Sequence, residues 1–313
     1  MPRKKYKFID LFAGVGGIRI AFENNKCECV FSSEWDQFSQ QTYSENFGHI
    51  PNGDITLISE KDIPDHDILT GGFPCQPFSS IGKREGFSHP TQGTLFFDIV
   101  RIIKEKKPKV FLLENVAGLF NHDKGRTLKL ITDTLEKELK YKTNIKILNS
   151  ADYGVPQIRK RVYIVGFSEA ISNSDKFEFN WPNKNKDKVS IGQFLENHEK
   201  GYAISKHLQN SYIYKLDDGK PQVIDKNSDI QVKTLVSTYH KVQRLTGTFV
   251  RDGDTGLRLL SHNECKRIMG FPSDFKFPVS RTQMYRQMGN SVAIPVVQKI
   301  AEEIVKTLKK ILS

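Results

Sequence analysis

The sequence predicts an α/β protein with a mostly parallel sheet and a second, smaller domain. Strand-like and helix-like segments alternate as far as Phe167, the pattern of helices that cross over between parallel strands. From about Asp175 to Gly256, Lys, Asn, Asp, Ser and Gly dominate and helical periodicity fades. We interpret this region as a small, irregular domain, although a long insertion of loops in one domain would have the same composition. Residues Val292–Leu312 are amphipathic again, so packing of this helix on the first sheet would make the small domain an interruption of the large one.

The individual elements follow from short apolar runs and from helical spacing, taken in chain order. The expected strands are Lys7–Phe12, Cys29–Ser33, Asp67–Thr70, Val110–Glu114, Asn144–Leu148 and Val162–Phe167. The expected helices are Gly17–Asn24, Gln37–Asn46, Leu95–Lys106 and Thr127–Lys140. In the third of these helices apolar residues recur at i, i+3, i+4 and i+7, which places them on one face. We expect residues 1–175, completed by 285–313, to form the large domain, 176–260 the small one, and 261–284 a connector.

Composition and charge limit the possible functions. The chain has 313 residues and a formal net charge of +11, which fits a polyanionic partner such as nucleic acid, although many basic proteins have no such partner. No apolar run approaches the length of a membrane span, and the first residues lack the apolar core of a signal peptide, so we expect a cytoplasmic protein. The four cysteines show no paired metal-site spacing, and we expect no bound metal.

A glycine turn follows the first expected strand. The run Phe12–Gly17 contains Gly14, Gly16 and Gly17, and glycines at such a turn let a ligand approach the backbone. Glu34 ends the next strand, where a carboxylate can accept hydrogen bonds from both hydroxyls of a ribose. The third glycine of a dinucleotide fingerprint is absent, so the pattern favours a nucleoside cofactor without phosphates, such as S-adenosylmethionine, with Asp54 near the adenine amino group. A purely structural strand-to-helix connection would also explain the turn.

Cys75 comes directly after Gly71-Gly72-Phe73-Pro74, at the end of another expected strand. The carboxyl edge of an open α/β sheet is where ligands bind. A cysteine at that edge is a candidate nucleophile if its thiolate is stabilised and a second group handles protons. The other cysteines, Cys27, Cys29 and Cys265, are expected to be reduced and buried.

Glu114 and an arginine pair supply the remaining candidate groups. Glu114 ends a buried-looking strand, and burial there would raise its pKa and keep it protonated. Arg159 and Arg161 alternate at the entrance of the strand Val162–Phe167, so in an extended chain they share one face and can bind phosphate or orient a carboxylate. A strand-capping acid and a solvated basic edge are the alternative explanations of these features.

Five motifs stand together in one order along the chain. They are Asp10–Gly17, Pro74-Cys75-Gln76, Glu114-Asn115-Val116, Gln157-x-Arg159-x-Arg161 and Gly289-Asn290-Ser291-Val292. In this order they resemble the DNA (cytosine-5)-methyltransferases of bacterial restriction-modification systems, over nearly the whole chain except about 175–230. The resemblance implies the class I S-adenosylmethionine-dependent methyltransferase fold, Rossmann-like with a seven-stranded mixed sheet, and a small, mainly β target-recognition domain. It also implies that duplex DNA lies between the domains and that the target cytosine is flipped out of the stack.

The resemblance implies a role for each matching residue. In catalysis, Cys75 would add to C6, Glu114 would hydrogen-bond N3, Arg161 would contact the cytosine carbonyl oxygen, and Arg159 would support the site and a nearby phosphate. Cofactor contacts would come from Asp10, Phe12, Gly14, Val15, Gly16, Gly17, Glu34, Trp35, Asp54, Ile55, Pro74, Leu95, Asn290, Ser291 and Val292. DNA contacts would come from Ser79, Lys83 and Arg84 in a closing loop, and from Thr234, Ser237, Tyr239, His240, Lys241 and Arg244 in the recognition segment.

The resemblance therefore implies a site-specific DNA (cytosine-5)-methyltransferase that acts as a monomer and is paired with a restriction endonuclease. Two alternatives remain open at this stage. The same fold could act on a tRNA cytosine, or the chain could be a DNA-binding relative without catalytic activity. The intact set Cys75, Glu114, Arg159 and Arg161 argues against the second alternative.

Overall fold

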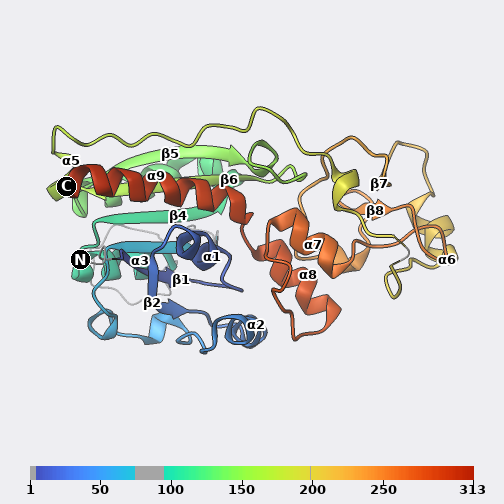
Figure 1. Ribbon diagram of the computed structural model, residues 1–313, viewed down its shortest axis with the longest axis horizontal. Helices are drawn as coiled ribbons and strands as arrows, with labels where there is room; N and C mark the ends of the chain where they lie inside the picture. Colours follow the sequence, from blue (N-terminus) through green and yellow to red (C-terminus); the bar gives the residue numbers. More distant parts are fainter. Residues whose placement is uncertain (1–4, 75–94, 198) are drawn as a thin grey trace.

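The computed structural model describes residues 5–74, 95–197 and 199–313 (Figure 1). A sheet with the strand order β2-β1-β3-β4-β6-β5 forms the larger of two bodies. The strands of the described chain are β1 (Lys7–Leu11), β2 (Glu28–Ser33), β3 (Ile68–Gly72), β4 (Val110–Val116), β5 (Tyr141–Asn149), β6 (Lys160–Ser168), β7 (Gln222–Ile224) and β8 (Thr248–Val250). The helices are α1 (Gly17–Asn24), α2 (Gln37–Phe47), α3 (Leu95–Lys106), α4 (Arg126–Asp133), α5 (Glu169–Ser172), α6 (Lys206–Leu208), α7 (His262–Met269), α8 (Arg281–Asn290) and α9 (Ile294–Leu312).

The large sheet is mixed, as the resemblance implied. Strands β1 to β4 are mutually parallel, whereas β6 runs antiparallel to both β4 and β5. Six strands belong to this sheet in the described residues, where seven were expected. Beyond β2, Asn52 makes an isolated parallel bridge to Ser33, so the sheet continues there by one residue pair only.

Side chains on the two faces of the sheet enter two separate cores. Phe8 belongs to one core and its neighbour Ile9 to the other, because successive residues of a strand point to opposite faces. Helices α1 and α9 contribute their buried residues to the first core, and α3 contributes to the second. The amphipathic pattern of α9 is explained by this packing, and Asn25 Nδ2 donates a hydrogen bond to Gln298 O across 273 residues of sequence (Figure 1).

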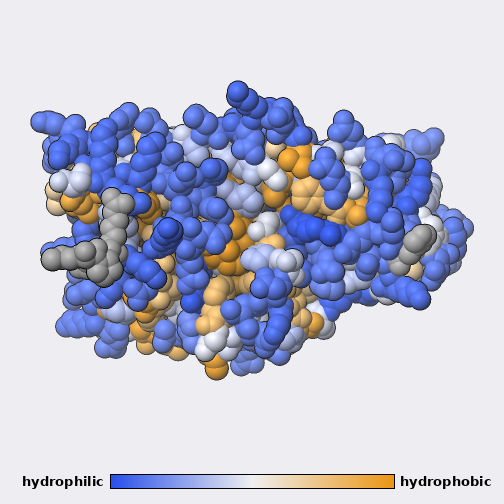
Figure 2. All heavy atoms as spheres, in the orientation of Figure 1, coloured by the Kyte–Doolittle hydropathy of each residue, from blue (hydrophilic) through white to orange (hydrophobic). Residues whose placement is uncertain are grey.

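The second body contains the parallel pair β7–β8 among turns and short helical segments, and α7 and α8 lie between it and the large sheet (Figure 1). The first core continues without a break from the sheet through α7 and α8 into this body, where it includes Phe249 and Leu257. Polar side chains cover most of the face shown in Figure 2, and hydrophobic ones gather near its middle. Within the described ranges, no helix combines the length and apolar character that crossing a membrane requires.

An ion-pair network centred on the fully buried Arg258 and Glu264 joins the second body to α7. The guanidinium of Arg258 donates to both oxygens of Glu264, at 2.8 and 2.9 Å, and to Asp252 at 2.9 Å. The Glu264 carboxylate also accepts from the backbone N–H of Glu196 and of Ser261, so every side of it has a donor. Such a network is stabilising only while all its partners are present.

We therefore expect Glu264→Gln to lower the free energy of unfolding by about 3 kcal/mol, since it leaves the buried guanidinium of Arg258 without its main counter-charge. Urea unfolding followed by circular dichroism measures this loss. Glu302→Gln is the matched control, because the Lys299–Glu302 pair is exposed and should contribute less than about 1 kcal/mol. Equal losses for the two variants would contradict the assignment.

Candidate active site

The carboxyl ends of four parallel strands meet at one edge of the sheet. In the strand register Leu11 pairs with Ser33 and with Gly71, and Gly72 pairs with Glu114. The glycine turn after β1, the segment after β2, Phe73 and Pro74 after β3, and the carboxylate near the end of β4 therefore lie at the same edge. This is the part of an open α/β sheet where ligands bind.

The glycine turn is fixed to the end of β2 by Glu34. The Glu34 carboxylate, 8% exposed, accepts from Gly14 N at 2.7 Å and from Asp36 N at 2.8 Å. Gly14 has a φ of +56° and open space where a Cβ would stand, so a ligand can lie directly against its backbone. Trp35 follows Glu34 with an exposed fraction of 73%, which leaves a large aromatic surface beside the turn.

The segment before α9 packs against the other side of the turn. A Cβ on Gly17 would lie 2.8 Å from Ser291 Oγ and 3.1 Å from Val292 Cγ2, so the two segments approach as closely as a glycine permits. Asn290 is exposed at the end of α8, and Leu95 begins α3. The structure thus brings residues near both ends of the described chain together around one turn.

Two of the expected cofactor residues lie deeper than the turn surface. Asp10 is fully buried within β1, where one oxygen accepts from Thr70 Oγ1 at 3.0 Å and the other has no partner. Ile55 is 3% exposed and packs in the second core, whereas the adjacent Asp54 is exposed. The geometry places Asp10 and Ile55 behind the residues that a ligand would touch.

Burial raises the pKa of Asp10 from 3.8 to about 7 against the opposing effects of Thr70 and Arg19. Because the pKa of Asp10 is higher in the native chain than in the unfolded one, folding takes up a proton at pH values between the two. The stability that the protonated carboxyl contributes is therefore lost as the pH rises from about 4 to about 7. For the native chain, we expect the free energy of unfolding to fall between pH 5 and pH 8. In Asp10→Asn, which has no titrating group at this position, that fall should be smaller by about 2 kcal/mol. Urea unfolding at both pH values tests this, with exposed Asp62→Asn as control; parallel pH curves for all three proteins would contradict it.

Glu114 and Arg161 form an ion pair at the end of β4. Arg161 Nε lies 3.1 Å from Glu114 Oε1, and the side chains are 15% and 12% exposed. Glu114 Oε2 lies 3.5 Å from the place where a Cβ on Gly72 would stand, which puts the carboxyl beside the end of β3. Burial raises the pKa of Glu114, and the nearby arginines oppose this only in part. Burial thus shifts this carboxyl toward its protonated form, the form that can donate a hydrogen bond.

Arg159 has a different environment from its neighbour Arg161. It is 2% exposed, and its terminal nitrogens donate to Leu235 O at 3.0 Å, to Gly289 O at 2.9 Å and to Ser291 O. The expected phosphate contact is at odds with this geometry, because these terminal groups are already bound to backbone carbonyls. Gln157, which the sequence motif includes but to which we assigned no role, is fully buried and accepts from Leu235 N at 2.9 Å.

Three of the four cysteines are held in environments that disfavour the thiolate. Cys75, Ser79, Lys83 and Arg84 lie outside the described residues. Burial raises the pKa of Cys27 and of Cys29 to about 12 and that of Cys265 well above its ordinary value, so these three remain protonated thiols at neutral pH. None of these three is therefore a good candidate nucleophile, and Cys75 stays the predicted one.

The expected DNA-contact residues of the second body fall into two groups. Tyr239 and Arg244 are buried: Tyr239 donates to Thr248 O, and Arg244 is paired with Asp218 and bonded to the carbonyls of Ile213 and Leu216. Direct DNA contact by these two is at odds with the structure. A second set keeps accessible surface in the same segment, and it consists of Thr234, Ser237, His240 and Lys241.

The backbone of this segment is strained between those anchors. Val242 has a φ of +52°, a left-handed conformation that is unfavourable for a β-branched residue. Gln243 holds the following turn by accepting from Thr238 and Thr246 through its side chain. Strain of this kind persists only where surrounding bonds enforce it, and it concentrates at functional sites.

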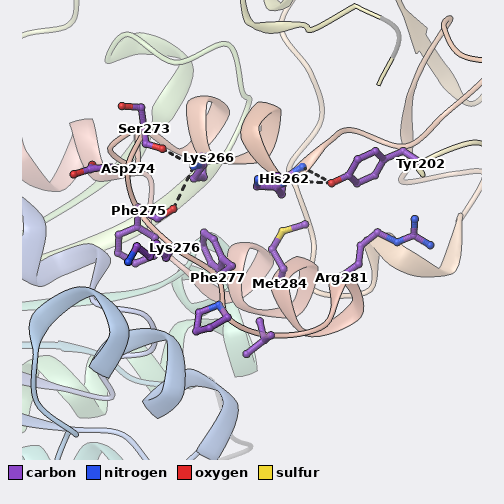
Figure 3. Close-up of a pocket in the computed structure, with 12 residues that line it drawn as sticks. Tyr202, His262, Lys266, Ser273, Asp274, Phe275, Lys276, Phe277, Arg281 and Met284 are labelled. Atoms are coloured by element: carbon purple, nitrogen blue, oxygen red, sulfur yellow. Dashed lines mark hydrogen bonds between the residues drawn. The ribbon is translucent and has the colours of Figure 1, made fainter. Parts of the chain in front are cut away.

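A hollow of about 560 Å³ lies beside α7 and α8, away from the strand-end site (Figure 3). Its cations are already engaged: Lys266 donates to Ser273 O and Phe275 O, and Arg281 donates to Gly201 O. None of its lining residues belongs to the strand-end site, and we assign it no part in catalysis.

The mixed sheet, the open glycine turn and the acid on the following strand define a class of protein, the Rossmann-like S-adenosylmethionine-dependent methyltransferases. Within that class, residues 6–306 match the model of the C-5 cytosine-specific DNA methylases. The chain belongs to this family.

Known relatives agree with this assignment. The chain is 61% identical over 306 residues to the type II methyltransferase M.MspI of Moraxella sp., covering 98% of this chain and 72% of that protein. It is 41% identical to M.HhaI of Haemophilus parahaemolyticus, covering 96% and 95%. The methyltransferase EhMeth of Entamoeba histolytica has the same fold, with a TM-score of 0.77 over 98% of this chain and 99% of that one at 22% identity. The predicted family and fold are confirmed, and the DNA methyltransferase interpretation holds over the two alternatives.

Proposed function

We infer that this protein transfers a methyl group from S-adenosylmethionine to C5 of a cytosine in duplex DNA and thereby protects DNA from a cognate restriction endonuclease. The observation that carries the proposal is the largely buried Glu114–Arg161 pair, at 3.1 Å, at the same sheet edge as the glycine turn in a chain of the C-5 cytosine methylase family. A protonated carboxyl and a guanidinium are the donors that N3 and the carbonyl oxygen of a flipped cytosine require.

The residues around the turn fit the cofactor. Open space at Gly14 admits a ligand against the backbone, and the Glu34 carboxylate retains lone pairs for two ribose hydroxyls. The exposed ring of Trp35, with Phe12 opposite, would enclose the adenine, and Asp54 would accept from its amino group. The other proposed contacts and supports are Asp10, Val15, Gly16, Gly17, Ile55, Pro74, Leu95, Asn290, Ser291 and Val292.

Cytosine C5 is a poor nucleophile until C6 carries an added group. In the proposed reaction the Cys75 thiolate adds to C6, and Glu114 gives its proton to N3 so that negative charge does not accumulate on the ring. Arg161 holds the carbonyl oxygen and keeps Glu114 in place. S-adenosylmethionine supplies an electrophilic methyl group for C5. A base then takes the C5 proton, the Cys75 sulfur leaves C6 as a thiolate, and N3 returns its proton to Glu114, which restores the aromatic ring and the starting state of the carboxyl.

DNA would lie between the two bodies. We propose residues 176–260 as the target-recognition domain, 261–284 as a connector, and 1–175 with 285–313 as the catalytic domain. Of the recognition segment, His240 and Lys241 are the proposed base-reading side chains, with Thr234 and Ser237 near the backbone. Tyr239 and Arg244 would hold the segment in shape. Ser79, Lys83 and Arg84 would contact DNA from the closing loop, and the protein would act as a monomer.

The test is incorporation of tritiated methyl groups from S-adenosylmethionine into duplex DNA and into tRNA, assayed side by side. We expect label in DNA as 5-methylcytosine, and bisulfite sequencing of the product then maps the recognition site. Label confined to tRNA, or found in neither nucleic acid, would refute the proposal.

A further inference from the structure

Both backbone polar groups of Leu235 are held by side chains from one short segment. Gln157 Oε1 accepts from Leu235 N at 2.9 Å, and Arg159 Nη1 donates to Leu235 O at 3.0 Å. Gln157 and Arg159 alternate at the entrance of β6, so they reach Leu235 from the same side. We call this arrangement the Leu235 clamp.

The same guanidinium also holds the segment that packs on the glycine turn. Arg159 Nη2 donates to Gly289 O at 2.9 Å and to Ser291 O. These bonds join segments 76 and 132 residues away from Arg159 in the sequence. A Cβ on Gly289 would lie 2.1 Å from Ser237 N, so the two segments that the guanidinium bridges are also in direct contact.

Burying the charged guanidinium of Arg159 costs free energy, and no carboxylate of the described residues is hydrogen-bonded to it. Burial and the neighbouring Arg161 lower the pKa of Arg159 to about 9, and its Nε–H is buried without a partner. A planar guanidinium can donate to three carbonyls from one rigid plane, which neither an ammonium nor an apolar side chain can do. Geometry therefore explains why an arginine stands here.

We propose that Arg159 is a positioning residue that couples cofactor binding to DNA recognition by fixing Leu235 relative to the segment Gly289–Ser291. The proposal rests on the proposed function and deepens it. A cofactor that fixes the turn at Gly17 also fixes Ser291, which packs on it. Through its bonds to Ser291 and Leu235, Arg159 then fixes the segment that contains Thr234 and Ser237. Binding of the cofactor therefore increases the affinity for DNA, and binding of DNA increases the affinity for the cofactor by the same factor.

The experiment is a binding cycle. Dissociation constants are measured for a duplex carrying the mapped site, with and without S-adenosylhomocysteine, and for S-adenosylhomocysteine with and without the duplex. We expect the native protein to bind each ligand at least about 5-fold more tightly when the other is present. In Arg159→Met this factor should fall below about 2-fold. Arg159→Lys should also lose it, because one ammonium cannot bridge the three carbonyls.

Two further variants separate coupling from structure. Gln157→Leu releases Leu235 without touching Gly289 or Ser291, so it should weaken the coupling while leaving the affinity for S-adenosylhomocysteine alone within about 2-fold. Lys160→Met removes a neighbouring exposed charge and should retain the full coupling. Thermal unfolding confirms that each variant is folded.

Several results would overturn the proposal. They are full coupling in Arg159→Met, equal coupling losses in Arg159→Met and Lys160→Met, or no coupling in the native protein. Failure of the proposed function would look different, because the native protein would then neither methylate nor bind the duplex.

Discussion

Replacing Cys75 with serine is expected to abolish methyl transfer, with a loss of at least about 10⁴-fold in kcat, while DNA binding persists. A serine hydroxyl does not ionise near neutral pH, so nothing adds to C6 and C5 stays unreactive. Duplex containing 5-fluorocytosine at the target gives a direct measurement, because fluorine replaces the departing proton and the enzyme stays attached. The native protein should form a covalent complex that survives denaturation, and Cys75→Ser should form none.

Cys29→Ser is the matched control for the loss of a thiol. The pKa of Cys29 is raised to about 12 and the residue takes no part in the proposed chemistry, so this variant should methylate DNA and form the complex. Turnover by Cys75→Ser at the native rate would refute the assignment of the nucleophile. Loss of the covalent DNA complex in Cys29→Ser would also refute that assignment.

Glu114→Gln is expected to lower kcat by about 10²- to 10⁴-fold, the usual contribution of a general acid. Glutamine keeps the shape and can donate to N3, but it has no acidic proton to give as negative charge develops. Because burial raises the pKa of Glu114 and its protonated form is the active one, the native rate should decline as the pH rises through that pKa. The variant should lack this decline. Rates at saturating DNA across a pH series measure both effects.

The control for this change is Glu105→Gln, an exposed position on α3. It should leave both the rate and its pH dependence unchanged. A Glu114→Gln rate within 10-fold of the native one, with the same alkaline decline, would show that the carboxyl only holds Arg161 in place.

The strands were predictable because they are buried and bounded by clear breaks. The expected strand Lys7–Phe12 is observed as Lys7–Leu11, and Val110–Glu114 as Val110–Val116. The pattern of apolar residues was less informative for the helix and the strand that precede β6. The expected helix Thr127–Lys140 ends as an α-helix at Asp133 and continues as a π-helical turn, and β5 begins at Tyr141. This edge strand alternates polar and apolar residues weakly, so its start carries little signal.

Local motifs identified the strand-end residues, since each follows an apolar run directly. The network around Arg159 was not predictable, because its partners are backbone carbonyls far away in sequence and carbonyls have no sequence signature. For Arg244 the sequence predicted a contact that the structure does not favour. A basic residue in a polar loop suggests a DNA contact, but Arg244 is buried and paired with Asp218, 26 residues earlier in the sequence. Gln157 did carry a signal, since it alternates with Arg159 and Arg161.

The position of α9 has a consequence for biosynthesis. One face of the sheet is covered by α1 together with α9, yet α9 follows β1 by almost the whole sequence. While the ribosome is still translating the second body, the apolar surface that Val297, Ile300 and Ile304 will cover is exposed to water. Nascent chains halted before this helix should therefore be substrates for chaperones and prone to aggregate, and this face of the sheet should be completed only after α9 has been synthesised and has left the ribosome.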